Sequence, residues 1–394
     1  MEIVNGTPFR LQALQAAEKS GHAVLVVLCK ASYAFPAEED GPVQAAPQQV
    51  PILPSDLFDG EPGLSTPLFE SDYVTRKHRC DVVVRASACA PQGRPVPELD
   101  VGFRVGRCEK RAHVVGDRRW QTRLTGLTPG APEPFTAMPI TYGRAYGGSC
   151  EVRGQPQAHP ANPVGCGYAG ARGEGDLHNQ PVPNIEQPGH PVTRIGGNYR
   201  PWSFGPIGRS WQPRLPLAGT YDDHWKDEIF PLLPADFDEG FFQCAPPDQQ
   251  IDHPRGGEDV HLLNLHPTRP HIRFVLPALD MPMAVLDRKR QLTFLQPVVD
   301  TVALDAEAER LIIVWRAQHP LRRSLREIEL VAAGSVCKRW WKSRVLGTED
   351  CGCGGVETDD EDLAPVNRAL DDDDDDDDDD LAPVDHELDD GAAA

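Results

Sequence analysis

Acidic and aromatic residues crowd together between positions 221 and 238, and this combination could hydrolyse a glycosidic bond. Glycoside hydrolases need two carboxylates held at a defined separation across that bond. The sequence does not fix such a separation, and Asp or Glu near a turn commonly caps main-chain amides instead. We favour the capping interpretation and keep a hydrolase acting on a glycan or related substrate as the alternative function. The cluster consists of Asp222, Asp223, Asp227, Glu228, Asp236 and Asp238, beside Tyr221, Trp225 and Phe237.

Metal chemistry has two possible sources in this chain. His253, His261 and His266 lie near one another in sequence, but their spacing is not that of two ligands on one helix face, and no HExxH motif occurs. Cys351 and Cys353 form a second suggestive pair, although a tetrahedral zinc site needs four ligands and no others follow at a familiar spacing. We therefore predict no metal and no cofactor.

A further set of residues lies in glycine-rich loops and could either brace those loops or contact a partner. Arg forms bidentate bonds and stacks on aromatic rings, and Tyr and Arg are enriched in interface hot spots. The glycines of the Arg255–Glu258 stretch predict a tight turn with positive φ, in which Arg and Glu pair locally. The candidates for loop core or partner contact are Tyr142, Arg144, Tyr146, Gly147, Gly148, Trp211, Arg214, Tyr221, Asp222, Trp225, Asp236, Phe237, Asp248, Gln249, Arg255, Gly256, Gly257 and Glu258.

Most of these candidates belong to a region, Pro129 to Gly257, that is dense in glycine and proline. Such a composition without periodicity is typical of disorder. The same region is rich in Tyr, Trp and Phe, which disordered segments lack because they bury no core. We therefore predict ordered loops that aromatic side chains pin in place.

The motifs in this region carry a family resemblance. They read PFTAMPITYGRAYGG (Pro134 to Gly148), NPVGCGY (Asn162 to Tyr168) and WSFGPIGRSWQPRLPLAGTYDDHW (Trp202 to Trp225), and continue as FPLLPADFDEGFFQCAPPDQQ (Phe230 to Gln250) and HPRGGEDVHLLNL (His253 to Leu265). In this order, and with FESDYVTRKHRCDVVV (Phe69 to Val84), GDRRW (Gly116 to Trp120) and ERLIIVWRA (Glu309 to Ala317), the chain resembles the domain-of-unknown-function 2169 family from about Asn5 to Val331.

The resemblance implies a binding protein and no enzyme. Members of that family look like adaptors or chaperones of bacterial type VI secretion systems, which stabilise a toxic effector and help to seat it on the spike. The expected partners are a secreted toxin effector and a spike protein of the PAAR or VgrG type. The expected location is the cytoplasm.

Outside the loops, short apolar segments rich in β-branched residues predict strands. We expect a mainly β fold, an antiparallel sandwich-like architecture with the loop-rich region packed across it. Leu11–Lys19 is helical by propensity, but Lys19-Ser-Gly21 equally indicates a hairpin turn. The ten expected strands are Ala23–Cys29, Asp81–Ala88, Leu99–Val105, Ala112–Val115, His271–Leu276, Met283–Leu286, Gln291–Leu295, Thr301–Leu304, Arg310–Trp315 and Glu327–Val331.

Composition divides the chain into a domain at 1–346, with 129–257 as a loop-rich insertion within it, and an acidic tail at 347–394. The net charge is −21, but residues 357–394 hold 19 of the 60 acidic residues and one of the 39 basic ones, which leaves only −3 on the rest. A nearly neutral body offers no footprint for nucleic acid. No run of apolar residues is long enough to insert into a membrane as a helix.

The tail contains an internal duplication. LAPVNRALDD (Leu363 to Asp372, copy 1) recurs as LAPVDHELDD (Leu381 to Asp390, copy 2), and ten consecutive aspartates overlap the end of copy 1 and separate it from copy 2. Like charges at this density oppose compaction, so we expect disorder throughout the tail. We favour a solubilising appendage; the sharper hypothesis is that the tail shields a basic partner or that each LAPV docks on one.

Overall fold

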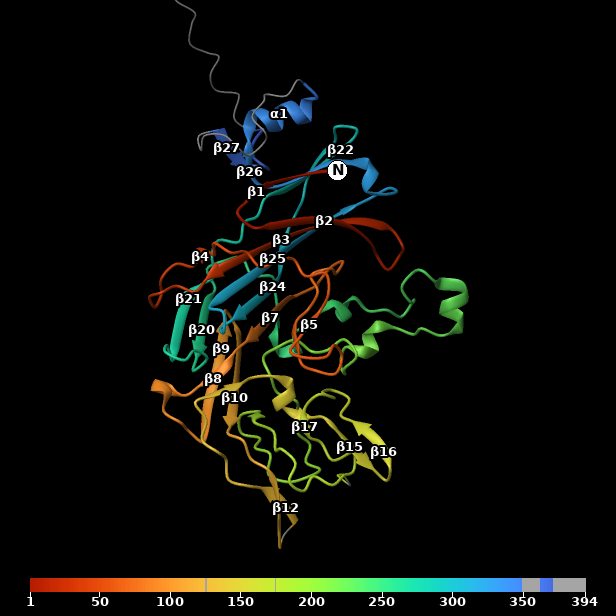
Figure 1. Ribbon diagram of the computed structural model, residues 1–394. Coiled ribbons are helices and arrows are strands. Elements are labelled where there is room, and N and C mark those ends of the chain that lie inside the picture. The colour runs from red at the N-terminus through yellow and green to blue at the C-terminus, as the bar shows by residue number, and fades with distance from the viewer. Residues whose placement is uncertain (125, 174, 349–361, 371–394) are drawn as a thin grey trace, which may run out of the picture.

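The computed structural model describes residues 1–124, 126–173, 175–348 and 362–370, and a seven-stranded sheet runs through its middle (Figure 1). Neighbours in this central sheet are mostly antiparallel, with one parallel pair between β24 and β7. Its strands, in spatial order, are β19 (Gln250–Ile251), β7 (Cys80–Arg85), β24 (Val298–Asp305), β25 (Arg310–Pro320), β3 (Ala23–Ala34) and β2 (Arg10–Ala17), while β4 (Gln44–Ala45) pairs with β3.

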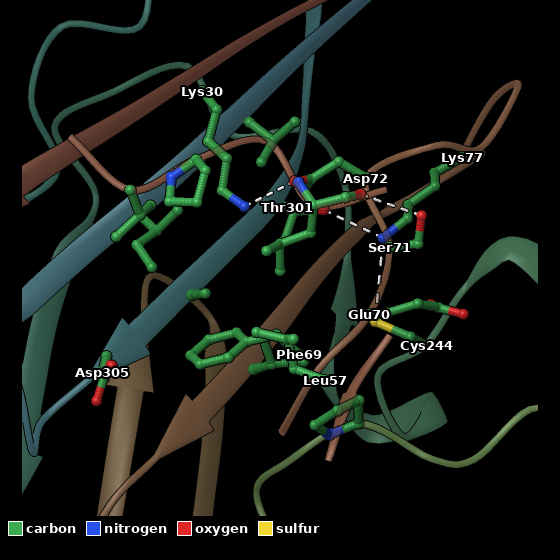
Figure 2. A pocket seen from close by; sticks show the side chains of 18 of the residues that line it. Lys30, Leu57, Phe69, Glu70, Ser71, Asp72, Lys77, Cys244, Thr301 and Asp305 are labelled. Carbon is green, nitrogen blue, oxygen red and sulfur yellow. Dashed lines mark hydrogen bonds and ion pairs between the residues drawn. The ribbon is translucent and has the colours of Figure 1, made fainter. Parts of the chain in front are cut away.

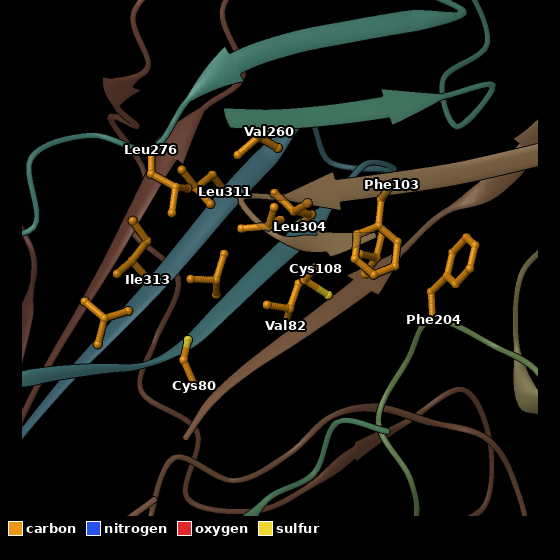
Figure 3. Close-up of a cluster of buried hydrophobic side chains, with 14 of the residues drawn as sticks. Cys80, Val82, Phe103, Cys108, Phe204, Val260, Leu276, Leu304, Leu311 and Ile313 are labelled. Atoms are coloured by element: carbon orange, nitrogen blue, oxygen red, sulfur yellow. The ribbon is translucent and has the colours of Figure 1, made fainter. Parts of the chain in front are cut away.

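A five-stranded sheet faces one side of the central sheet and completes a sandwich. Its order is β18 (Ile185–Glu186), β10 (Cys108–Val115), β9 (Glu98–Val105), β20 (Asp259–Leu263) and β21 (His271–Val275). Alternate residues of each strand point into the shared core, as the period of two along a strand requires. Val82 and Leu304 from the central sheet belong to the same buried cluster as Phe103 and Val260 from the other sheet (Figure 3). The fold is thus mainly β and sandwich-like, as the sequence predicts.

A third sheet lies at one end of the molecule, beside the only α-helix among the described residues (Figure 1). Its strands are β1 (Glu2–Gly6), β26 (Ile328–Cys337), β22 (Met283–Asp287) and β23 (Leu292–Phe294), and helix α1 (Lys338–Leu346) follows β26 directly. The helix ends where Gly347 takes a left-handed conformation (φ 70°), which glycine adopts without steric cost. This helix is not among the elements predicted from the sequence.

Residues 362–370 depart from the disorder expected of the acidic tail. Leu363–Pro365 form strand β27, which pairs antiparallel with the end of β26. Val366 and Ala369 are buried in a cluster with Trp340 and Trp341. This burial of apolar side chains offsets the entropy cost of ordering the segment, although the acidic charge around it favours disorder. The remaining tail residues, with copy 2, Cys351 and Cys353, lie outside the described part of the chain.

Each of the ten predicted segments contains a strand, and several strands are longer than expected, but Asp81–Ala88 is divided between β7 and Ser87–Cys89, which pair in different sheets. Leu11–Lys19 is not helical: residues 10–17 form β2, which pairs with β3 across a hairpin, and so the turn signal outweighs the helix propensity. The eight cysteines in the described part of the chain are free thiols, and six of them are buried. No helix among the described residues is long and apolar enough to cross a bilayer.

Short two-stranded ladders lie outside the three larger sheets. The hairpin of β11 (Trp120–Arg123) and β12 (Gly126–Pro129) projects at the end of the molecule opposite α1 (Figure 1). The loop-rich region holds the pairs β14 (Tyr146–Gly147) with β17 (Cys166–Gly167) and β15 (Ser149–Val152) with β16 (Gln155–Ala158), and its β13 (Ala137–Pro139) pairs with β8 (Ser87–Cys89). Before that region, β5 (Leu57–Phe58) pairs with β6 (Pro67–Phe69).

Candidate partner-binding surface

The Tyr142–Gly148 loop is part of the core. Tyr142 is buried and meets the ring of Trp211 edge-on, with centroids 5.3 Å apart, and burial raises its pKa. Arg144 donates to Asp117 and to Asn184, both at 3.1 Å, and so braces neighbouring loops. Tyr146 packs against the ring of Tyr199 at 5.2 Å, and burial raises its pKa to about 12.

The two glycines of this loop are required by close backbone contacts. Gly147 and Gly148 both have positive φ, 149° and 88°. A Cβ at either position would lie 2.2 Å from a carbonyl oxygen, that of Asn162 or of Gly165 respectively. Buried Asn162 donates to the carbonyl oxygens of Tyr142 and Tyr146, and so closes the loop from inside.

Arg214 is a buried brace. Its guanidinium donates to the carbonyl oxygens of Ile207 and Phe241 and to the carboxylate of Glu70, at 2.6 to 2.7 Å. Trp211, beside it in sequence, is also buried, as is Phe237, which packs against Phe241. These side chains hold the loop-rich region together and are not available to a partner.

Gln249 and Asp248 anchor a buried lysine, Lys110, which is not among the residues predicted from the sequence. Lys110 donates to Gln249 at 2.8 Å and to Asp248 at 3.1 Å, and its ammonium lies 4.5 Å from the ring centre of Trp202. Burial lowers the pKa of Lys110 to about 8, partly offset by Asp248. Gln249 also donates to the carbonyls of Val82 and Phe204, so this group fastens the loops to the sandwich.

The turn at Arg255–Glu258 forms as its glycines predict. Gly256 and Gly257 have φ of 96° and 82°. The carboxylate of Glu258 accepts from the main-chain amides of Arg255 and Gly256, at 2.8 and 2.9 Å. Glu258 therefore holds the turn by accepting from main-chain amides, and not by the local pairing with the Arg255 side chain that the sequence predicts.

One group of predicted residues lies on the surface, on an arm formed by residues 219–236. The arm projects from the side of the central sheet, and its base is fixed by Lys19, which donates to the carbonyl oxygen of Phe237 at 2.8 Å (Figure 1). Asp236 closes the loop by accepting from the amide and hydroxyl of Thr220, at 2.9 and 2.7 Å. These two hydrogen bonds lower the pKa of Asp236.

The arm holds a ladder of aromatic rings that is partly open to solvent. Trp225 lies edge-on to Tyr221 and to Phe230, with centroids 4.7 and 5.6 Å apart. Its indole nitrogen donates to the carbonyl oxygen of Leu232, and its amide donates to Asp222, both at 2.9 Å. Tyr221 is 53% exposed and Phe230 is 66% exposed. The arm therefore presents ordered apolar rings to solvent.

Two acids of the arm, Asp222 and Asp236, and Asp238 just beyond it accept hydrogen bonds that cap turns. Asp222 caps the helical turn at Trp225, Asp236 binds Thr220, and Asp238 accepts from the amide of Gly240 at 2.7 Å. These bonds are the capping role that the sequence analysis favours over glycan hydrolysis. The arm carries five acidic residues and one lysine, so its apolar rings are surrounded by negative charge.

The three sequence-predicted histidines have separate partners. His253 binds the carbonyl oxygen of Val299, His261 lies beside Arg104, and His266 binds Glu309. Within the described ranges, no group of three or more His, Cys, Asp or Glu residues is arranged to hold a metal ion.

A cavity of about 180 Å³ lies on the face of the central sheet that points away from the sandwich core (Figure 2). Val83, Ile312 and Val314 form its floor, and Leu57 and Phe69 from the β5–β6 segment form part of its cover. Two buried ion pairs lie at its polar side, between Lys30 and Asp72 and between Lys77 and Asp81, each at 2.7 Å. The sequence signal for this site was the Phe69–Val84 stretch, which holds three of these four charges.

Cys244 beside this cavity has a neighbour that could activate a thiol, but its environment prevents this. Its sulfur lies 4.0 Å from the ammonium of Lys77. Burial, and then the charge of Asp81, nevertheless raise the pKa of Cys244 well above its ordinary value. A thiol that remains protonated is a poor nucleophile, so the geometry favours a structural role for Cys244.

No curated protein and no solved structure matches this chain. The model of one family does match, over residues 20–316, which is most of the chain. The protein belongs to the family described as an uncharacterized protein conserved in bacteria, DUF2169.

Proposed function

We propose that this protein is a non-enzymatic adaptor or chaperone that binds a type VI secretion effector in the bacterial cytoplasm and helps to load it onto a PAAR or VgrG-type spike. The observation that carries the proposal is the arm at 219–236, in which hydrogen bonds hold Trp225 and ring contacts with Trp225 order Tyr221 and Phe230, which remain exposed. Large exposed apolar groups surrounded by polar residues are typical of protein interaction sites.

The arm also indicates the chemistry of the partner surface. Its acidic residues attract cations, and its Tyr, Trp and Phe rings bind Lys or Arg through their faces. The preferred contact is therefore a basic segment that also carries apolar side chains. In this proposal the toxic activity belongs to the effector, and the adaptor contributes binding alone.

The proposal is tested by purifying the tagged full-length chain from its native cell and identifying the bound proteins by mass spectrometry. The wild-type chain is expected to recover a toxin together with a PAAR or VgrG-type protein. The double variant Tyr221→Ala/Phe230→Ala is expected to recover at least about tenfold less, because interface aromatics often contribute about 2 kcal/mol or more.

Leu64→Ala is the matched control, since Leu64 is also a large exposed apolar residue, 72% exposed, but lies away from the arm in sequence. This variant should recover as much partner as the wild type. Repeated recovery of the wild-type chain without any partner would overturn the adaptor function. Equal recovery by the arm variant and by Leu64→Ala would instead exclude the arm as the binding surface.

A further inference from the structure

The first copy of the tail duplication occupies a defined groove. β27 pairs with the end of β26, with Ala364 opposite Val336 and Leu363 opposite Cys337, and the amide of Val366 donates to the carbonyl oxygen of Gly334 at 2.9 Å. We call the groove, formed by the β26 edge from Gly334 to Cys337 with Trp340 and Trp341, the LAPV groove.

Three residues of copy 1 are buried in the LAPV groove. Ala364, Val366 and Ala369 are buried, with Val366 fully so, in one cluster with Val336, Trp340 and Trp341. Leu363 and Leu370 are half-buried, whereas Pro365, Asn367 and Arg368 point to solvent. The recognised pattern is therefore Leu-Ala-x-Val-x-x-Ala-Leu. Pro365 is tolerated because Val366, its neighbour, makes the ladder bond to Gly334, and alternate positions of an antiparallel pair make none.

Copy 2 repeats this pattern with one change at a buried position. Leu381, Ala382, Val384 and Leu388 correspond to the groove-contacting Leu363, Ala364, Val366 and Leu370. Two of the three differences between the copies fall at the positions of Asn367 and Arg368, whose side chains are exposed and are not buried in the groove. The third places Glu387 where copy 1 has Ala369, which is 1% exposed.

We propose that the LAPV groove is a peptide-binding site with two ligands in the same chain, and that copy 2, Leu381–Leu388, occupies it when copy 1 leaves. Copy 1 binds in preference, because seating copy 2 brings the Glu387 carboxylate to an apolar position. The 18-residue offset between the copies lets copy 2 reach the same groove, and a tethered ligand acts at a high effective concentration. Exchange would leave copy 1 available to another protein while the β26 edge and both tryptophans stay covered.

Hydrogen exchange measured by mass spectrometry on the full-length chain tests the exchange of copies. In Val366→Asp, which disables copy 1, the β26 residues Ser335–Cys337 are expected to keep partial protection, and residues 381–388 are expected to gain it. In Val366→Asp/Val384→Asp, exchange at Ser335–Cys337 should be roughly ten- to hundredfold faster than in Val366→Asp, as expected for loss of one buried valine anchor. Val384→Asp alone should match the wild type.

Two further variants address the preference for copy 1. Glu387→Ala added to Val366→Asp should restore protection towards the wild-type level, because the misfit residue is gone. Glu387→Ala alone, which disturbs no seated residue, should give copy 2 measurable protection at the expense of copy 1. Glu387→Ala alone keeps the test valid even if Val366→Asp destabilises the whole fold. Faster hydrogen exchange at β9, in the five-stranded sheet, would reveal such a global destabilisation.

Equal exchange in Val366→Asp and in the double variant would overturn the proposal. So would a Glu387→Ala chain in which residues 381–388 gain no protection. Protection of copy 2 that appears only when the chain dimerises would overturn the assignment to a single chain.

Discussion

At the residue scale, Gly148 shows how a loop without regular structure can be held in one conformation. Gly148→Ala is expected to destabilise the protein by about 3 kcal/mol, because its Cβ would lie 2.2 Å from the Gly165 carbonyl oxygen at a φ of 88°. Gly63→Ala is the control: Gly63 also has positive φ, 78°, but nothing lies within 4 Å of its Cβ. That variant should lose only about 1 kcal/mol, from backbone strain. Urea unfolding measures both, and equal losses would contradict a role for the close contact.

Buried thiols predict how stability depends on pH. Burial raises the pKa of Cys29 to about 12 from an ordinary 9.0. The unfolded chain therefore releases this proton from about pH 9 upward while the folded chain retains it, so the stability contributed is complete below pH 9 and is lost as pH rises towards 12. Between about pH 8 and about pH 10 this one thiol should cost roughly 1 kcal/mol. Urea unfolding of Cys29→Ala should show a correspondingly shallower loss over that range; an unchanged slope would contradict the assignment.

At the element scale, Asp81 fastens β7 to the segment that follows the arm, and Lys77 balances the buried charge of Asp81. Asp81 accepts from Lys77, from the side chain of Gln243 and from the amides of Cys244 and Ala245. Lys77→Met should therefore cost about 3–5 kcal/mol in urea unfolding, because it leaves a carboxylate buried without its cation.

The control for this pair is Arg76→Met, which removes the exposed ion pair between Arg76 and Glu239. An exposed pair contributes less than about 1 kcal/mol, so this variant should unfold almost as the wild type does. A Lys77→Met protein as stable as Arg76→Met would show that the carboxylate of Asp81 is adequately solvated by its remaining donors.

The strands were predictable as elements because short apolar runs rich in β-branched residues are local signals, and β3 and β25 each contain such a run. Helix α1 was not, since Trp340 and Trp341 are buried in a cluster with Val4, Ala284 and Ala364, which are distant in sequence. The same limit applies to the site. Tyr142 and Tyr221 occur in similar glycine-rich, aromatic sequence, yet one is buried and the other is 53% exposed, because only the assembled fold decides which loop covers which.

At the scale of the whole molecule, negative charge is divided between the arm, which is part of the fold, and the acidic run that begins at Asp371. A deletion from Glu357 would not test the acidic run alone, because it also removes β27 and uncovers Trp340 and Trp341. Ending the chain after Leu370 is the cleaner change, since it keeps copy 1 in its groove and removes only the acidic run and copy 2 beyond it.

This truncated chain and an arm variant together locate the charges that attract the partner. The arm variant is Asp222→Asn/Asp223→Asn/Asp227→Asn/Glu228→Gln, in which the amide oxygen introduced at position 222 can still accept from the Trp225 main-chain amide. Affinity of the wild type for its partner should fall between about 0.05 and 0.5 M salt, because screening shortens the reach of surface charge. The arm variant should bind more weakly at low salt and show a flatter dependence, whereas the truncated chain should keep the wild-type slope. The opposite result, a flat response in the truncated chain alone, would assign recognition of a basic partner to the acidic run and leave the arm to its aromatic contacts.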